Sequence, residues 1–203
     1  MRSAVRVGLF GACFVCLLLI GCGWQQTEQL LWPEQTQSHT QLTERWTRQG
    51  RISSGLQTRV RVRATYKSLQ WRDSFVRRWD EVYGLSQKDA AAMRQEQHKE
   101  YRQGAAFVIA LSSSDPKYAR LDWSDGLWRM QLLYSGRRVD PVDIRALEWP
   151  KPKLETFFPY TKPWLQFYEV QFPVVIEDKP IQLLFGGPGG PIELQWDLAS
   201  LSS

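Results

Sequence analysis

Short stretches in which apolar and polar residues alternate recur along this chain, and they constrain its fold more than any other feature. The clearest stretch runs from Arg59 to Tyr66. One face comprises Val60, Val62, Ala64 and Tyr66, and the other face comprises Arg59, Arg61 and Arg63. Alternation with a period of two, rich in β-branched residues, is typical of a strand with one solvated side.

Similar segments follow at intervals, separated by Gly, Pro and Ser turn residues. They are 128–134, 139–147, 168–172, 181–185 and 192–196, and a further segment, 107–111, is an unbroken apolar run that is expected to form a strand buried on both faces. The turn at Ser135-Gly136 predicts a hairpin between 128–134 and 139–147. About seven short strands favour an antiparallel β-sandwich of the immunoglobulin-like type. We therefore expect a mainly β fold, with one domain over 44–203.

A helical pair is predicted to interrupt these strands at 68–104, between the first two of them. A stripe of apolar residues falls at helical spacing, with Ser68 as N-cap and Gly84 as the end of the first helix. Its members are Trp71, Phe75, Trp79, Val82 and Tyr83. This stripe is expected to pack on a sheet, the alternative being an exposed face that serves as a partner-binding groove or a membrane-interface patch. The second helix, from Ser86 to Gly104, is polar almost all round, so we expect it to be solvated.

The N-terminus has the pattern of an export signal. Arg2 and Arg6 precede an uncharged apolar run at 8–20, which is shorter than the roughly 18 residues of a membrane-spanning helix. The run ends at Leu19-Ile20-Gly21-Cys22, which resembles the lipobox of bacterial lipoproteins. An ordinary signal peptide that holds a cysteine, or an uncleaved anchor, is the alternative interpretation.

The resemblance to lipoproteins covers about a tenth of the chain and implies a cellular location. It implies that 1–21 is a signal peptide and that Cys22 is lipidated. The polar, Gln-rich composition that follows predicts that 22–43 is the lipidated N-terminus and a flexible tether. In that family, Asp after the cysteine often retains the protein in the inner membrane. Because Gly23 stands there, the resemblance implies the periplasmic face of the outer membrane. The body resembles uncharacterised outer-membrane lipoproteins, with no specific family indicated.

The positions of the cysteines and the net charge argue against a disulfide-stabilised domain and against a nucleic-acid-binding protein. Cys13 and Cys16 lie in the leader, so the mature chain has only Cys22 and no disulfide framework. The net charge is +5; without Arg2 and Arg6, 24 basic residues face 21 acidic ones, which leaves +3. That bias is too small to indicate nucleic-acid binding.

No combination of residues indicates catalysis, a cofactor or a metal site. His39 is expected in the tether and His98 on a solvated helix face, neither with a spaced ligand companion. Asp122 and Asp125 are interpreted as turn caps rather than cation ligands. The glycine-rich segment 186–191 lacks the Lys of a phosphate-binding loop and is interpreted as a tight connection between two strands.

Two surfaces remain as candidate binding sites. Arg59, Arg61 and Arg63 form either a docking strip for an anionic glycan, lipid headgroup or acidic protein, or a wet face neutralised by acidic neighbours. A second set lies in an aromatic-rich connection and either binds glycan or lipid or plugs one end of the sandwich. Its members are Phe157, Phe158, Tyr160 and Trp164. We expect a non-catalytic envelope lipoprotein that acts through protein contacts, the alternative being a glycan- or lipid-binding module.

Overall fold

A computed structural model describes residues 33–54, 57–115, 118–121, 127–187 and 189–201. The leader, Cys22, Asp122 and Asp125 lie outside these ranges. The chain from Gln37 onward forms one compact unit, and the fold described below is that of this unit. Within the described ranges, no helix combines the length and the apolar composition needed to cross a membrane.

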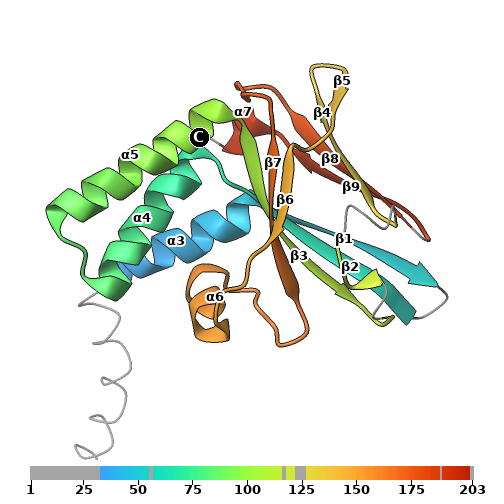
Figure 1. Cartoon of the computed structure of the whole chain (residues 1–203), viewed down its shortest axis with the longest axis horizontal. Helices are drawn as coiled ribbons and strands as arrows, with labels where there is room; N and C mark the ends of the chain where they lie inside the picture. The colour runs from blue at the N-terminus through green and yellow to red at the C-terminus, as the bar shows by residue number, and fades with distance from the viewer. Residues whose placement is uncertain (1–32, 55–56, 116–117, 122–126, 188, 202–203) are drawn as a thin grey trace, which may run out of the picture. The chain divides into compact units, whose positions relative to one another are not determined.

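The described strands form two sheets in which all neighbouring strands are antiparallel (Figure 1). The first sheet has the order β1 (Thr47–Ser54), β2 (Gln57–Tyr66), β3 (Ala105–Ser113), β7 (Gln166–Phe172) and β6 (Asp143–Ala146). The second has the order β5 (Arg137–Val139), β4 (Arg129–Tyr134), β8 (Ile181–Gly187) and β9 (Gly190–Trp196). The prediction of a mainly β fold with antiparallel strands is therefore confirmed.

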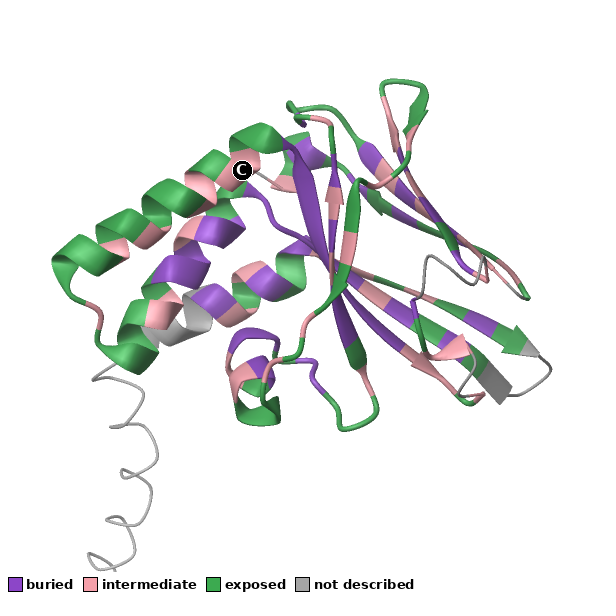
Figure 2. Ribbon diagram, viewed as in Figure 1, coloured by how far each residue is buried: buried purple, intermediate pink, exposed green. Residues whose placement is uncertain are grey.

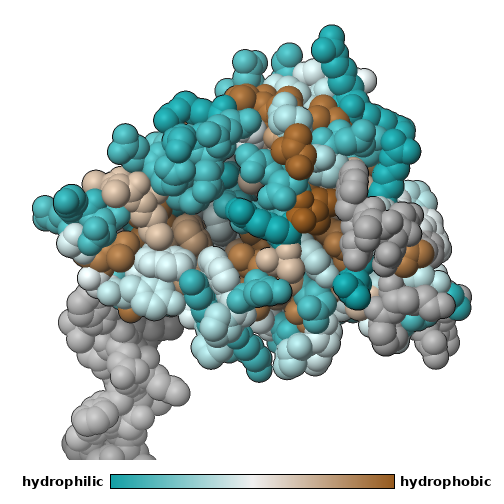
Figure 3. All heavy atoms as spheres, viewed as in Figure 1, coloured by the Kyte–Doolittle hydropathy of each residue, from teal (hydrophilic) through white to brown (hydrophobic). Residues whose placement is uncertain are grey.

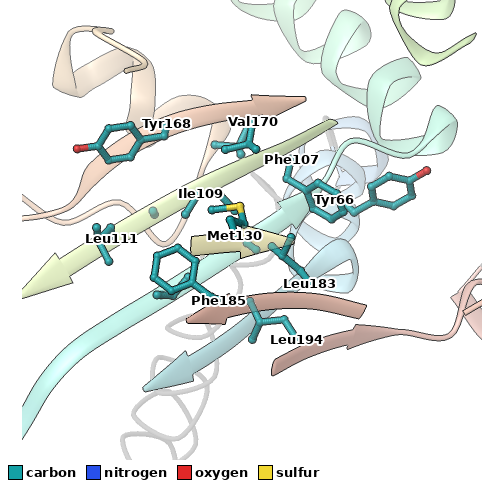
Figure 4. Close-up of a cluster of buried hydrophobic side chains, with 14 of the residues drawn as sticks. Tyr66, Phe107, Ile109, Leu111, Met130, Tyr168, Val170, Leu183, Phe185 and Leu194 are labelled. Carbon is teal, nitrogen blue, oxygen red and sulfur yellow. The ribbon is translucent and has the colours of Figure 1, made fainter. Parts of the chain in front are cut away.

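The two sheets contribute to one apolar core. Figure 4 shows side chains from both sheets gathered in a single cluster, in which the predicted apolar face of β2 takes part. Its labelled members are Tyr66, Phe107, Ile109, Leu111, Met130, Tyr168, Val170, Leu183, Phe185 and Leu194. The alternation read from 59–66 thus placed the apolar residues correctly.

Strand β3 is buried on both faces. Every residue from Ala105 to Leu111 is buried, and most of this strand is purple in Figure 2. One face of β3 meets the shared core, and Val108 on the other face lines a pocket with Trp71 and Phe158. The apolar run at 107–111 reflects this double burial, as predicted.

The predicted helical pair is present as α4 (Leu69–Tyr83) and α5 (Gln87–Gln103). The Ser68 hydroxyl accepts the Trp71 N–H at 3.1 Å, and Gly84 ends α4 in the left-handed conformation with φ of 63°. No residue of α5 is buried, and its surface is predominantly hydrophilic (Figure 3). The pair connects β2 to β3, not the first strand to the second as predicted, because β1 precedes them.

Helix α3 (Pro33–Trp46) corrects the prediction of a flexible tether over 22–43 for the part that the structure describes, 33–43. His39, Thr43 and Trp46 are buried, which is the spacing of one helix face. The Thr43 hydroxyl accepts the indole N–H of Trp71 at 3.0 Å, and the Trp46 carbonyl accepts that of Trp196 at 2.8 Å. The folded body therefore begins before residue 44.

The segment predicted as one strand at 139–147 is two strands in different sheets. Ser135 and Gly136, with φ of 48° and 76°, turn β4 into β5 as predicted. The chain then passes Pro141 and enters β6, which pairs with β7 of the other sheet. Short helices α6 (Lys151–Phe157) and α7 (Leu198–Leu201) complete the described elements, and β8 and β9, the strands joined by the predicted tight connection, pair with each other.

Candidate functional site

The arginines predicted to share one face of β2 do so, and the structure adds a fourth. Arg51 of β1 lies directly opposite Arg61 in the antiparallel register, and Gln49 lies opposite Arg63. Arg51, Arg59 and Arg61 are exposed, and Arg63 is partly buried. We call Arg51, Arg59, Arg61 and Arg63 the arginine face. Arg51 was not predicted as a member of this face because β1 lacks regular alternation.

The arginine face carries little internal compensation. In the described part of the chain, none of its four guanidinium groups forms an ion pair with an acidic side chain. The guanidinium of Arg63 lies 5.2 Å from the centre of the Tyr160 ring, a cation–π contact. Like charges directly opposite each other in a sheet are destabilising, so the Arg51–Arg61 pair costs stability unless an anion is nearby.

The predicted aromatic binding loop is corrected by its burial. Phe157, Phe158 and Tyr160 are 0%, 1% and 9% exposed, whereas Trp164 is 62% exposed. The Phe157 ring packs against Phe75 at 4.9 Å between centroids, which joins α6 to α4. Phe157, Phe158 and Tyr160 therefore belong to the hydrophobic core and offer no exposed platform, and only Trp164 of the four is exposed.

A pocket of about 200 Å³ lies between the α4–α5 pair and the outer face of the first sheet. One side is aromatic and comprises Trp71, Phe75, Trp79, Trp149 and Phe158. The polar side comprises Lys67, Gln97, Glu100 and Glu169, and the remaining lining residues are Met93, Val108 and Leu147. The aromatic stripe of α4 therefore packs inward and also forms a pocket wall; of its predicted members, Val82 and Tyr83 are 40% and 50% exposed.

Charged side chains are paired at the polar end of this aromatic pocket. The ammonium of Lys67 donates to one Glu169 oxygen, and Arg145 donates to the other at 2.9 Å. Arg72, which is 1% exposed, donates to Glu100 at 2.8 Å, and Lys67 lies 3.7 Å from the same Glu100 oxygen. The polar end is thus a preformed cluster of charges.

Burial and pairing act against each other in this cluster. Burial alone would raise the pKa of Glu169, but Lys67 and Arg145 outweigh it and hold that pKa below its usual value. Burial, aided by Arg72, lowers the pKa of Lys67, and Glu169 and Glu100 offset part of that effect. The Lys67 ammonium is bound to carboxylates, so this arrangement does not present a free amine nucleophile.

His39 is buried, not solvated in a tether as predicted. The Phe157 carbonyl, which can only accept, lies 3.1 Å from Nε2, and the Ser74 hydroxyl lies 3.0 Å from Nδ1. The neutral ring therefore carries its proton on Nε2. Burial lowers the pKa of His39 to about 4, aided by Arg78 and Arg77 and opposed by the Phe157 hydrogen bond.

His98 is also less solvated than predicted, because its Nε2 lies 2.7 Å from an Asp73 oxygen. This pair joins α5 to α4. Across the residues that the structure describes, no three His, Cys, Asp or Glu side chains are grouped as metal ligands.

Comparisons with known proteins add one structural likeness. No protein-family model matches the chain, and no curated protein matches it in sequence. The chain is similar to the crystal structure of a protein of unknown function from Burkholderia pseudomallei K96243. The likeness covers 82% of this chain and 86% of that chain, with 9% sequence identity and a TM-score of 0.40.

Proposed function

We propose that this chain is a non-catalytic lipoprotein of the cell envelope, held at the periplasmic face of the outer membrane by lipid on Cys22. The support for the anchor is the charged and apolar leader that ends in Leu19-Ile20-Gly21-Cys22. Two or more fatty chains on one cysteine would hold a protein stably at a bilayer. The body would carry its two sheets as an immunoglobulin-like sandwich and act through noncovalent contacts with an envelope protein.

The arginine face is the observation that carries the proposed contact. Arg51 and Arg61 repel each other across adjacent strands, and no described acidic side chain pairs with either. An acidic protein surface that docked there would relieve this repulsion and gain charge-assisted hydrogen bonds from planar guanidinium groups. None of the exposed large apolar side chains of the described chain belongs to β1 or β2. A face without apolar side chains to insert suits a protein surface better than a bilayer.

Mass spectrometry of the protein from its native host tests the anchor. The expected N-terminal peptide begins at Cys22 and carries acyl chains, and the Cys22→Ala variant is expected to keep its leader. An N-terminus that retains Met1 and carries no acyl mass would contradict the anchor.

Photo-crosslinking in the intact envelope tests the docking face. A photoreactive residue at position 112 suits this purpose, because Ser112 pairs with Arg61 in the sheet. The double variant Arg51→Glu/Arg61→Glu is expected to abolish the crosslinked species. Arg137→Glu/Arg138→Glu makes the same change of charge at two exposed positions of β5 and is the matched control. Equal crosslinking in both variants would refute docking through the arginine face. Salt-sensitive binding of the pure protein to anionic vesicles would instead indicate that this face binds lipid.

A second candidate function is the binding of a small ligand, and the aromatic pocket is the observation that favours it. Apolar walls with a few fixed polar groups are typical of ligand sites. Saturable quenching of tryptophan fluorescence by small amphipathic ligands, with Trp71→Phe as the altered variant, would support this function. Failure of all such ligands to bind would remove it.

A further inference from the structure

A lysine ammonium group lies against two tryptophan rings at the edge of the aromatic pocket. The Nζ atom of Lys153, in α6, is 4.3 Å from the ring centroid of Trp149 and 4.4 Å from that of Trp79. Both distances are well inside the roughly 6 Å limit for a cation–π contact. Trp79 and Trp149 also line the pocket, so the ammonium position and the pocket adjoin through these two rings.

The two rings form a corner that is fixed by packing. Their centroids are 5.9 Å apart and their planes meet at 72°. The buried Phe157 ring supports both, with centroids 5.0 Å from Trp79 and 5.8 Å from Trp149. Because α4, α6 and the connection before α6 each supply one ring, the corner is set by the tertiary fold and does not depend on Lys153 alone.

The charge of Lys153 is compensated by these rings. Its neighbour Lys151 pairs with Glu155 at 3.5 Å, whereas Lys153 forms no ion pair with any described residue. The corner therefore already binds an ammonium group, which shows the ligand chemistry that suits it.

We propose that Trp79 and Trp149 form a binding site for a methylated organic ammonium group, which Lys153 occupies while no ligand is bound. A primary ammonium is compact and strongly hydrated, so it gives up favourable solvation to contact the rings. A quaternary ammonium has a weaker hydration shell and methyl groups that pack on two ring faces at once, and paired aromatic walls are a recognised site for such ligands. This inference rests on the second candidate function and names the ligand class of that site.

Lys153 acts in this arrangement as a tethered competitor. A group held beside its own site has a high effective concentration, so it raises the apparent Kd of any free ligand. Replacing Lys153 by Met removes the ammonium nitrogen and keeps most of the stem, so the rings lose their charged competitor while the packing beside them is retained.

Titration of the full-length protein with tetramethylammonium, followed by tryptophan fluorescence, tests the proposal. The wild-type protein is expected to show saturable binding, and Lys153→Met is expected to bind about tenfold more tightly because the tethered competitor is absent. Lys151→Met removes a charge from the same helix without touching the rings and is expected to match the wild type. Lys153→Met/Trp149→Leu is expected to lose at least about ten-fold of the affinity of Lys153→Met, since one π face is missing.

Choline and its neutral isostere 3,3-dimethylbutan-1-ol separate charge from shape. Choline is expected to bind Lys153→Met, and the neutral alcohol is expected to bind at least about ten times more weakly. Equal binding of the two compounds would overturn the ammonium site while leaving the pocket as a site for apolar ligands. An absence of saturable tetramethylammonium binding in both the wild type and Lys153→Met would overturn the ammonium site as well. An unchanged thermal melting temperature of each variant serves as the control that its fold is intact.

Discussion

Acidification is expected to destabilise this protein through one buried side chain, His39. The ring is 2% exposed, and its pKa of about 4 lies well below the ordinary value of 6.5. Between these two pH values the unfolded chain binds a proton that the folded protein does not. The stabilisation is therefore complete above pH 6.5 and is lost progressively as the pH falls toward 4.

The size of the loss follows from the two pKa values. Each unit of pKa difference corresponds to about 1.4 kcal/mol, so a fall from 6.5 to about 4 gives a loss of about 3 kcal/mol. Most of that loss is reached by pH 4.5. The pKa of Glu169 lies below its usual value, so its own contribution is lost at lower pH than that of His39.

Urea unfolding followed by tryptophan fluorescence at pH 7.5, 6.5, 5.5 and 4.5 measures this loss. His39→Gln is expected to be less stable at pH 7.5 and to lack the acid-induced step. His98→Gln, which changes the only other histidine, is the matched control and is expected to retain the step. A wild-type unfolding free energy that is constant from pH 7.5 to 4.5, or a full acid-induced loss in His39→Gln, would refute the reasoning.

Three other perturbations test the packing. Glu169→Gln leaves the Lys67 ammonium beside a neutral amide and is expected to lower the urea unfolding free energy by about 3 kcal/mol. The double variant Lys67→Met/Glu169→Leu should recover most of that free energy, and an equal loss in the single and the double variant would contradict this expectation. Gly104→Ala places a Cβ 2.1 Å from the Phe172 carbonyl oxygen, so melting is expected at least about 5 °C lower, and an unchanged melting temperature would exclude the clash. Burial raises the pKa of Tyr160 and of Tyr66, so stability should fall as the pH rises above 10, and Tyr160→Phe should reduce that fall, whereas the share of Tyr66 should remain.

The sequence predicted the elements whose side-chain period is regular. Strand β2 alternates strictly because one face meets the core and the other meets water, and that pattern survives in the linear sequence. Helix α4 was equally readable, since Ser68 and Gly84 mark its ends and aromatic residues mark its buried face. Three members of the arginine face followed from the same alternation.

The sequence did not predict α3, which buries polar side chains, or β1, which buries few side chains. Helix α3 turns His39 and Thr43 inward, and hydrogen bonds satisfy both, so hydrophobicity gives no signal there. Strand β1 buries Ile52 but otherwise presents polar residues and Gly50, so no alternation is visible. The Lys153 contact joins residues that are distant in sequence, and only the tertiary fold brings Trp79 to Trp149.

The packing of α3 on the body limits how far this protein could extend from a bilayer. With the proposed lipid on Cys22, only the chain up to Gln37 separates the acyl chains from the compact unit. At roughly 3.6 Å per residue, that chain spans at most about 55 Å even when fully extended. Any partner that meets the arginine face would therefore have to present its acidic surface close to the same membrane leaflet.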